Sequence, residues 1–220
     1  MLYFANKLLD DDVHKKLRKD LMISDGWIDG KLTATGEAKE QKRNVELSGL
    51  CEDHRIFSER IIKVLKEDNK VKYFAYPSKI FSILFTRTGK GMYYGPHVDI
   101  ANSDLGRRDL SFTIFLNQPD EYQGGELILN IPPERKAIKL NAGEIIIYPT
   151  KYLHEVKEVK EGERIVCVGW IESEIANNED RESLSMLHKG LSEVIRNHGS
   201  SSCTMTMMVA INNIYKRFIG

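Results

Sequence analysis

The chain has 220 residues, of which 41% are hydrophobic and 29% charged, a composition typical of a soluble globular protein with a substantial core. Its 32 basic and 32 acidic residues give a formal net charge of zero, which argues against nucleic acid as a partner bound through overall charge. No apolar run reaches the ~20 residues that a membrane-spanning helix needs, so no membrane partner is expected.

The cysteines and the N-terminus bear on the cellular compartment. Cys51, Cys167 and Cys203 are far apart and odd in number, so they indicate neither a disulfide framework nor a zinc site. The first residues, MLYFANKLLDDD, lack the basic flank and apolar stretch of a secretory signal. A cytoplasmic location is therefore the simplest expectation.

The first third of the chain has mainly helical patterning. In DDDVHKKLRKDLMI, residues 10–23, acids precede bases and Val13, Leu17 and Leu21 share one face, which predicts a helix. A glycine-rich loop is expected over 24–36, with further helices over 37–50 and 52–68. We expect residues 1–70 to form a helical region that supports the core. The sequence leaves open whether the loop around Trp27 covers a functional site.

From Val71 onward the pattern changes to short strands. Eight aromatic or β-branched runs are separated by Gly, Pro, Asn and Asp, and they cover residues 71–76, 79–88, 108–117, 125–131, 136–141, 144–150, 154–159 and 164–173. This many short strands in about a hundred residues predicts a sandwich or barrel-like β core. We place this core at residues 71–175.

The last segment, 176–220, returns to helical patterning. Leu184, Leu187, Leu191 and Ile195 recur at helical spacing, and 203–220 is a candidate for a last helix. The expected fold class is thus α+β and mainly β, with a β core flanked by helices from both ends. The terminal helices would serve equally well to support a homodimer or to buttress the core.

A candidate metal site lies in YYGPHVD, residues 93–99. On an extended segment, side chains i and i+2 point to the same side, so His97 and Asp99 can aim a nitrogen and an oxygen at one point. Of the six histidines, only His154 shares the β region with His97. Two histidines and one carboxylate on strands form the facial triad typical of non-haem Fe(II) oxygenases, with open positions for co-substrate and dioxygen.

Arg164 stands ten residues after His154 and opens a strongly apolar strand. An unpaired charge at this position would be costly, so the guanidinium needs an anionic partner. The distal carboxylate of 2-oxoglutarate is suitable, because an arginine fork can pair both of its oxygens. A cupin-like module that binds metal without turnover would have no reason to keep this arginine.

These motifs resemble the 2-oxoglutarate and Fe(II)-dependent dioxygenase superfamily, and within it the prolyl 4-hydroxylase group and the bacterial PKHD-type hydroxylases. The similarity extends from WIDGKLTATGEAKEQKRNVEL through DLSFTIFLNQPDEYQGGELIL to GEIIIYPTKYLHEVKEVKEGERIVCVGWIES and NIYKRF, which is nearly the whole chain. Two positions depart from the family pattern, since Thr88 stands where tyrosine is frequent and Ile100 where asparagine is common. Both lie near the expected mouth of the site, so they bear on the substrate more than on the metal.

The resemblance implies a double-stranded β-helix, the jelly-roll fold of the cupins, with iron at its mouth. His97, Asp99 and His154 would be the metal ligands, and Arg164 would anchor 2-oxoglutarate. Three further residues are candidates to line the pocket or contact the co-substrate, with ordinary core packing as the alternative: Thr113, Tyr94 and Tyr148.

The implied reaction decarboxylates 2-oxoglutarate to succinate and carbon dioxide and hydroxylates an organic substrate. It requires Fe(II), 2-oxoglutarate and O2, with L-ascorbate (vitamin C) as an accessory cofactor. The family likeness favours a prolyl residue of a protein or peptide as the substrate. An oxygenase that acts on a free small molecule is the alternative, and a non-catalytic cupin-like metal-binding module is the second.

Overall fold

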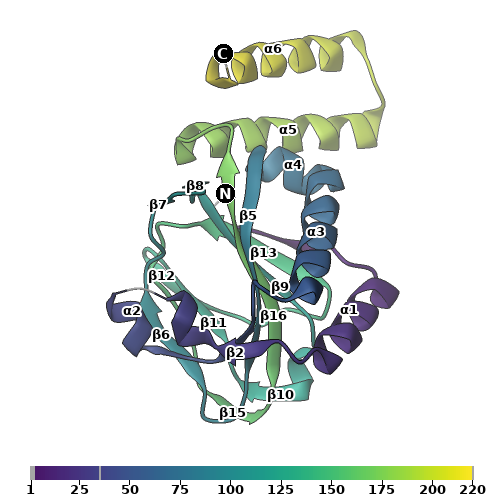
Figure 1. The fold of residues 1–220 in the computed structure, drawn as a ribbon. Coiled ribbons are helices and arrows are strands. Elements are labelled where there is room, and N and C mark those ends of the chain that lie inside the picture. The colour runs from purple at the N-terminus through teal and green to yellow at the C-terminus, as the bar shows by residue number, and fades with distance from the viewer. Residues whose placement is uncertain (1–2, 35, 220) are drawn as a thin grey trace.

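The computed structural model describes residues 3–34 and 36–219. Its centre consists of two facing β-sheets, and helices cover the outer face of the larger sheet and extend beyond one end of it (Figure 1). This architecture confirms the predicted double-stranded β-helix with flanking helices. Within residues 3–34 and 36–219, no helix is both long enough and apolar enough to cross a membrane.

The larger sheet has seven antiparallel strands. In spatial order they are β1 (Phe4–Lys7), β13 (Glu144–Pro149), β9 (Leu110–Phe115), β16 (Arg164–Ser173), β5 (Pro77–Thr88), β4 (Val45–Leu47) and β2 (Trp27–Asp29). All six residues of β9 are buried, because helices cover one face of the sheet and the second sheet covers the other. A strand buried on both faces explains the continuous apolar run in the sequence.

The smaller sheet has five strands and faces the larger one. In spatial order they are β12 (Glu134–Ile138), β11 (Leu127–Ile131), β14 (His154–Val156), β6 (Tyr93–His97) and β3 (Lys42–Arg43). Two short ribbons complete the β structure: β7 (Asn102–Ser103) with β8 (Gly106–Arg107), and β10 (Tyr122–Gly124) with β15 (Val159–Gly162). Apolar residues from both sheets, among them Phe115, Leu129 and Val166, fill the space between them at one end.

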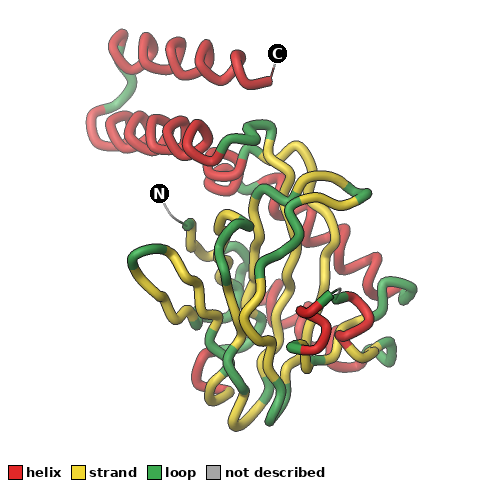
Figure 2. Tube along the Cα trace, turned by 90° about the vertical axis from the view of Figure 1, so that its left-hand side faces the viewer, coloured by secondary structure: helices red, strands yellow, loops and turns green. Residues whose placement is uncertain are grey.

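The helices form two groups. Helices α1 (Asp11–Ile23), α3 (Glu52–Glu67) and α4 (Asn69–Ala75) pack buried side chains against the outer face of the larger sheet. Helices α5 (Asn178–His198) and α6 (Ser202–Ile219) form an antiparallel pair that stands off the sheets (Figures 1 and 2). Three short pieces remain: η1 (Gly30–Thr33), α2 (Glu37–Glu40) and η2 (Pro119–Glu121).

The helix predicted over 37–50 is wrong beyond its first turn. After α2 the chain forms β3 and β4, where the side chains of Lys42, Asn44 and Glu46 are buried while Arg43 is exposed. This alternation is the period of a strand. It is hard to recognise in the sequence because the inward-facing residues are polar.

The strand predicted over 71–76 is also wrong, because these residues lie in α4 and its C-terminal cap. The Asp68 carboxylate accepts a hydrogen bond of 2.8 Å from the backbone N–H of Val71, which caps the helix. Val71, Phe74 and Ala75 are buried at helical spacing. The loop predicted over 24–36 contains β2 and η1, and β1 was not predicted at all. Residues 3–70 therefore supply strands to both sheets as well as helices.

Candidate active site

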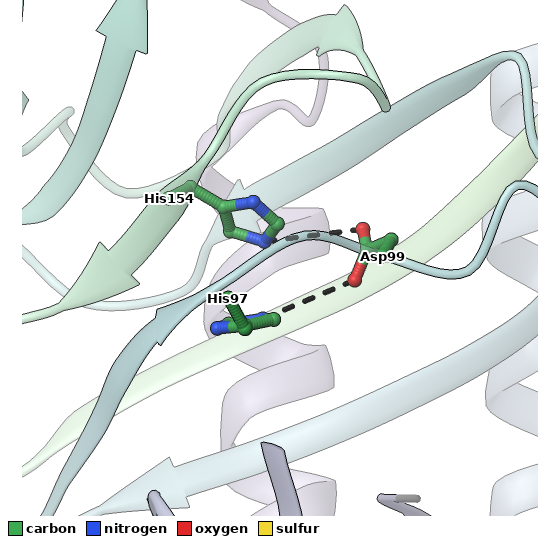
Figure 3. Close-up of side chains that lie close together, drawn as sticks. All are labelled: His97, Asp99 and His154. Carbon is green, nitrogen blue, oxygen red and sulfur yellow. Dashed lines mark ion pairs between the residues drawn. The ribbon is translucent and has the colours of Figure 1, made fainter. Parts of the chain in front are cut away.

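Three predicted ligands lie together where β6 and β14 run side by side. His97 is the last residue of β6, Asp99 follows it after one valine, and His154 is the first residue of β14. The two strands pair antiparallel with His154 directly opposite His97. Figure 3 shows the two imidazoles and the carboxylate turned toward one another. One strand pairing thus unites residues that are far apart in the sequence.

The spacing of the three groups suits a metal ion. One nitrogen of each histidine and one oxygen of Asp99 all lie within 4.8 Å of one another. Nε2 of His97 lies 3.9 Å from Asp99 Oδ1, and Nε2 of His154 lies 3.8 Å from Oδ2 (Figure 3). Two imidazoles and one carboxylate on one side of a centre match the facial triad of non-haem Fe(II) sites.

The backbone fixes which ring nitrogen of each histidine faces the centre. Nδ1 of His97 lies 2.8 Å from the carbonyl of Gly95, and Nδ1 of His154 lies 3.0 Å from that of Tyr152. Because a carbonyl can only accept, each Nδ1 carries the proton and each Nε2 keeps a lone pair for a metal. Burial and then the neighbouring His154 lower the pKa of His97 to about 4, which favours the neutral, metal-binding form.

Two side chains from the larger sheet hold the Asp99 carboxylate. The hydroxyl of Ser111 donates to Oδ2 over 2.8 Å, and the indole Nε1 of Trp170 donates to the same oxygen over 2.9 Å. Thr150 lies 3.0 Å from the Ser111 hydroxyl and can donate to it, which leaves the Ser111 proton for Asp99. In the described part of the chain Oδ1 receives no hydrogen bond, so it is the oxygen available to a metal.

A cavity of about 320 Å³ between the two sheets joins this triad to Arg164. Arg164 is only 2% exposed and sits opposite Thr88 across β16 and β5. Burial lowers the pKa of its guanidinium, and its Nε has no hydrogen-bond partner among the described residues. No carboxylate in residues 3–34 or 36–219 forms an ion pair with Arg164. The cavity therefore contains a desolvated cation without an anion, as a site for a dicarboxylate would.

The other predicted site residues also line this cavity. The Tyr94 ring stacks on His97 with 3.6 Å between ring centroids, and the Tyr148 ring lies edge-on to His154 at 5.6 Å. Burial raises the pKa of both tyrosine hydroxyls, so both stay neutral. Thr113 is buried on β9. Trp27 does not line the cavity, although Thr33 and other residues that follow it do.

Several cavity residues were missed by sequence reasoning. Trp170 could have been found, because it faces inward on β16 at an even spacing from Arg164. Arg108 lines the mouth and lies 4.1 Å from the centre of the Trp170 ring. Lys42 and Glu46 lie on strands that were taken for a helix. These residues have no sequence motif and are brought to the cavity by the fold.

Comparison with known proteins agrees with this chemistry. The 2OG-Fe(II) oxygenase superfamily matches residues 83–172. A PKHD-type hydroxylase of Prochlorococcus marinus strain MIT 9211 is 43% identical over 218 residues, covering 99% of both chains. Another from strain MIT 9313 is 42% identical over 97% of both chains. This superfamily uses Fe(II), 2-oxoglutarate and O2, and the donor set and Arg164 fit these groups.

Solved structures share the fold at low sequence identity. A Pseudomonas putida prolyl-4-hydroxylase is 17% identical with a TM-score of 0.56, covering 78% of this chain and 92% of that one. A Trichoplax adhaerens prolyl hydroxylase, solved with a peptide fragment of a hypoxia inducible factor, is 15% identical with a TM-score of 0.58, covering 84% and 87%. The geometry of the cavity and the full-length similarity lead to one conclusion: this chain belongs to the PKHD-type hydroxylases, a group of 2-oxoglutarate-dependent oxygenases.

Proposed function

We propose that the protein hydroxylates a prolyl residue of a protein or peptide, with Fe(II) held by His97, Asp99 and His154 and 2-oxoglutarate anchored by Arg164. The buried, unpaired guanidinium of Arg164 in the same cavity as the triad carries this proposal. It supports turnover with a dicarboxylate rather than passive metal binding. When bound, iron supplies the oxidation of 2-oxoglutarate and of a C–H bond by dioxygen.

The chain's own residues arrange these reactants. His97, Asp99 and His154 would hold the iron with three ligand atoms and leave its other positions to 2-oxoglutarate and O2. Arg164 can pair both oxygens of a carboxylate and so fix the co-substrate in one orientation. Thr113 and Tyr148 line the cavity and would contact the bound co-substrate. Tyr94 would hold the His97 ring in place by stacking on one of its faces. Burial of these groups keeps bulk water from the centre.

The residues at the mouth of the cavity favour a peptide as the substrate. Val98 and Ile100 flank Asp99 and are 51% and 55% exposed, so they offer apolar surface to a prolyl ring. Arg108 has no ion-pair partner in the described residues, and its guanidinium can donate to a peptide carbonyl beside that ring. The prolyl hydroxylases among the structures of similar fold add to this expectation.

Three accessory predictions accompany this function. L-ascorbate would keep the iron in its Fe(II) state between turnovers. The protein would act in the cytoplasm, as its scattered cysteines suggest. The exposed apolar side chains of α6, among them Met205 and Met208, would suit a homodimer, one of the two roles considered for the terminal helices.

A mass-spectrometric assay tests the proposed substrate class. Purified protein is incubated with Fe(II), 2-oxoglutarate, ascorbate and a panel of short prolyl peptides with blocked ends. We expect at least one peptide to gain the mass of one oxygen atom in step with succinate release, and His97→Ala to abolish both. If only free small molecules in a cell extract gain oxygen, the peptide assignment is wrong and the small-molecule alternative replaces it.

A further inference from the structure

A cluster of buried polar side chains lines the cavity beside the metal ligands and has no part in the chemistry described above. We call it the wall cluster, and it consists of Thr33, Lys42, Asn44 and Glu46. Lys42, Asn44 and Glu46 are 4%, 8% and 1% exposed. Charged side chains are rarely buried this deeply in a protein unless they are paired.

The two charges of the wall cluster cancel each other. The Lys42 ammonium lies 2.6 Å from Glu46 Oε1 and donates to the Thr33 hydroxyl over 2.8 Å. Thr33 in turn donates to the second oxygen of Glu46. An ammonium has three N–H groups, and the third finds no acceptor in the described part of the chain. The cluster is therefore neutral as a whole, and one N–H group of the Lys42 ammonium can still donate a hydrogen bond.

The side chain of Asn44 has no hydrogen bond within residues 3–34 and 36–219, and its Oδ1 is buried. This Oδ1 packs so closely on Gly30 that a Cβ on that glycine would lie 1.9 Å away. A buried amide without a partner costs about 1–3 kcal/mol. Because Asn44 lines the cavity, a bound molecule can accept a hydrogen bond from its Nδ2.

The position of the wall cluster points to the substrate rather than to the co-substrate. Lys42 is opposite Tyr94 in the β3–β6 pair, with its ammonium 5.3 Å from the centre of the Tyr94 ring, and that ring stacks on His97. Thr33 belongs to η1, which borders the cavity. Arg164 lies two strands away from Glu46, across β5. The cluster thus lies between the η1 edge of the cavity and a metal ligand.

We propose that Lys42 and Asn44 are specificity-determining residues that donate hydrogen bonds to a carbonyl-type oxygen of the substrate. This inference rests on the proposed function and names the group by which its substrate is held. Glu46 already neutralises Lys42, so a neutral peptide carbonyl fits the cluster better than a free carboxylate, which would bring an uncompensated charge into the cavity.

Two variants test this proposal without leaving a buried charge unpaired. Asn44→Leu keeps the shape of the side chain and removes the amide, while the double variant Lys42→Met with Glu46→Gln removes both charges together. Lys79→Met is the matched control, since the Lys79 ammonium lies 5.5 Å from the ring of Phe81, outside the cavity. Thermal unfolding of each variant shows whether it folds.

The readouts separate binding of the substrate from binding of the co-substrate. The Kd of a blocked prolyl peptide is measured anaerobically by calorimetry with Fe(II) and 2-oxoglutarate present, and KM values for peptide and 2-oxoglutarate are measured in air. We expect the Kd and KM for the peptide to rise about tenfold or more in both variants, as the loss of one hydrogen bond implies, with a change below about twofold in the KM for 2-oxoglutarate. Lys79→Met should match the wild type.

The possible failures are distinguishable. If the wild-type protein neither binds nor oxidises any blocked prolyl peptide, the peptide function fails and this inference fails with it. If the wild type uses the peptide and the variants keep its Kd and KM, only the inference is wrong. A rise in the KM for 2-oxoglutarate instead would assign the cluster to the co-substrate and also overturn it. The same measurements are repeated with free L-proline. If the variants raise the Kd and KM for proline more than those for the peptide, a carboxylate is the hydrogen-bond acceptor.

Discussion

The indole Nε1 of Trp170 donates a hydrogen bond of 2.9 Å to Oδ2 of Asp99, which connects the mouth of the cavity to a predicted metal ligand. Arg108 lies over the face of the same indole. The hydrogen bonds from Trp170 and Ser111 keep Oδ2 occupied, and Oδ1 faces Nε2 of His97. We therefore expect Trp170 to be a positioning residue, which would act on a bound metal through Asp99.

Replacing Trp170 by phenylalanine should weaken iron binding. The Trp170→Phe change keeps an aromatic ring under Arg108 and removes the donor to Asp99. Loss of such an outer partner typically costs 10–100-fold in metal affinity, so we expect the Kd for Fe(II) to rise by about that factor. Anaerobic metal titration measures it. Trp27→Phe is the control, because the Nε1 of Trp27 has no hydrogen-bond partner within residues 3–34 and 36–219, and equal effects of the two changes would refute the role of Trp170.

Removal of either histidine should abolish turnover. In His97→Ala or His154→Ala, two ligands remain and the facial triad is incomplete. We expect succinate production to fall to background in both variants. His198→Ala, at the exposed end of α5, should keep the wild-type rate. Normal turnover in one of the cavity variants would remove that histidine from the metal site.

Replacing Arg164 by methionine should separate co-substrate binding from metal binding. Loss of one partner of a buried charge pair costs about 2–5 kcal/mol, so the Kd for 2-oxoglutarate should rise about 30-fold or more while that for Fe(II) changes little. Equal effects on both affinities would argue against Arg164 as the anchor.

The same variant should change how stability responds to 2-oxoglutarate. Without the co-substrate, Arg164 is a desolvated charge with no anion, so Arg164→Met should raise the free energy of unfolding of the free protein. Added 2-oxoglutarate should raise the Tm of the wild type but not that of the variant, because a ligand stabilises only the state that binds it. Thermal unfolding with and without 2-oxoglutarate measures both effects.

The close approach of Gly30 to Asn44 predicts a stability cost at the edge of the cavity. A Cβ in Gly30→Ala would lie 1.9 Å from Asn44 Oδ1, so the Asn44 side chain must move and the free energy of unfolding should fall by about 1–3 kcal/mol. Gly190→Ala is the matched change in α5, where nothing lies within 4 Å of the new methyl group. That change should stabilise the protein by up to about 1 kcal/mol. Chemical denaturation compares the two.

The grouping of the three candidate metal ligands was predictable from the sequence, because strand geometry brings these residues together. His97 and Asp99 share one side of a strand end, and His154 was the only other histidine in the β region. The structure pairs His154 with His97 directly, as that reasoning requires. Arg164 was identified by the cost of burying an unpaired charge, and it is buried with no ion-pair partner in the part of the chain that the structure describes. Strand periodicity and the apolar neighbours of a charged residue can both be read directly from a sequence.

The wall cluster was not predictable, because its strands do not look like strands. Lys42, Asn44 and Glu46 alternate inward, yet their polarity and the helix-favouring residues before them indicated a helix. The partners of Asp99 come from β9 and β16 and meet it only through tertiary packing. In α4 a cap at Asp68 outweighs the strand preference of the residues that follow. Contacts between distant segments decided the first two cases, and a local cap decided the third.

Anaerobic absorption spectroscopy tests the central claim most directly. The purified protein is titrated with Fe(II) and then with 2-oxoglutarate. We expect the weak visible charge-transfer band of the chelate in the wild type, no band in His154→Ala, and a band that needs much more 2-oxoglutarate in Arg164→Met. A folded wild-type protein that binds Fe(II) and 2-oxoglutarate without this band, or a His154→Ala variant that retains it, would contradict the assignment of the site.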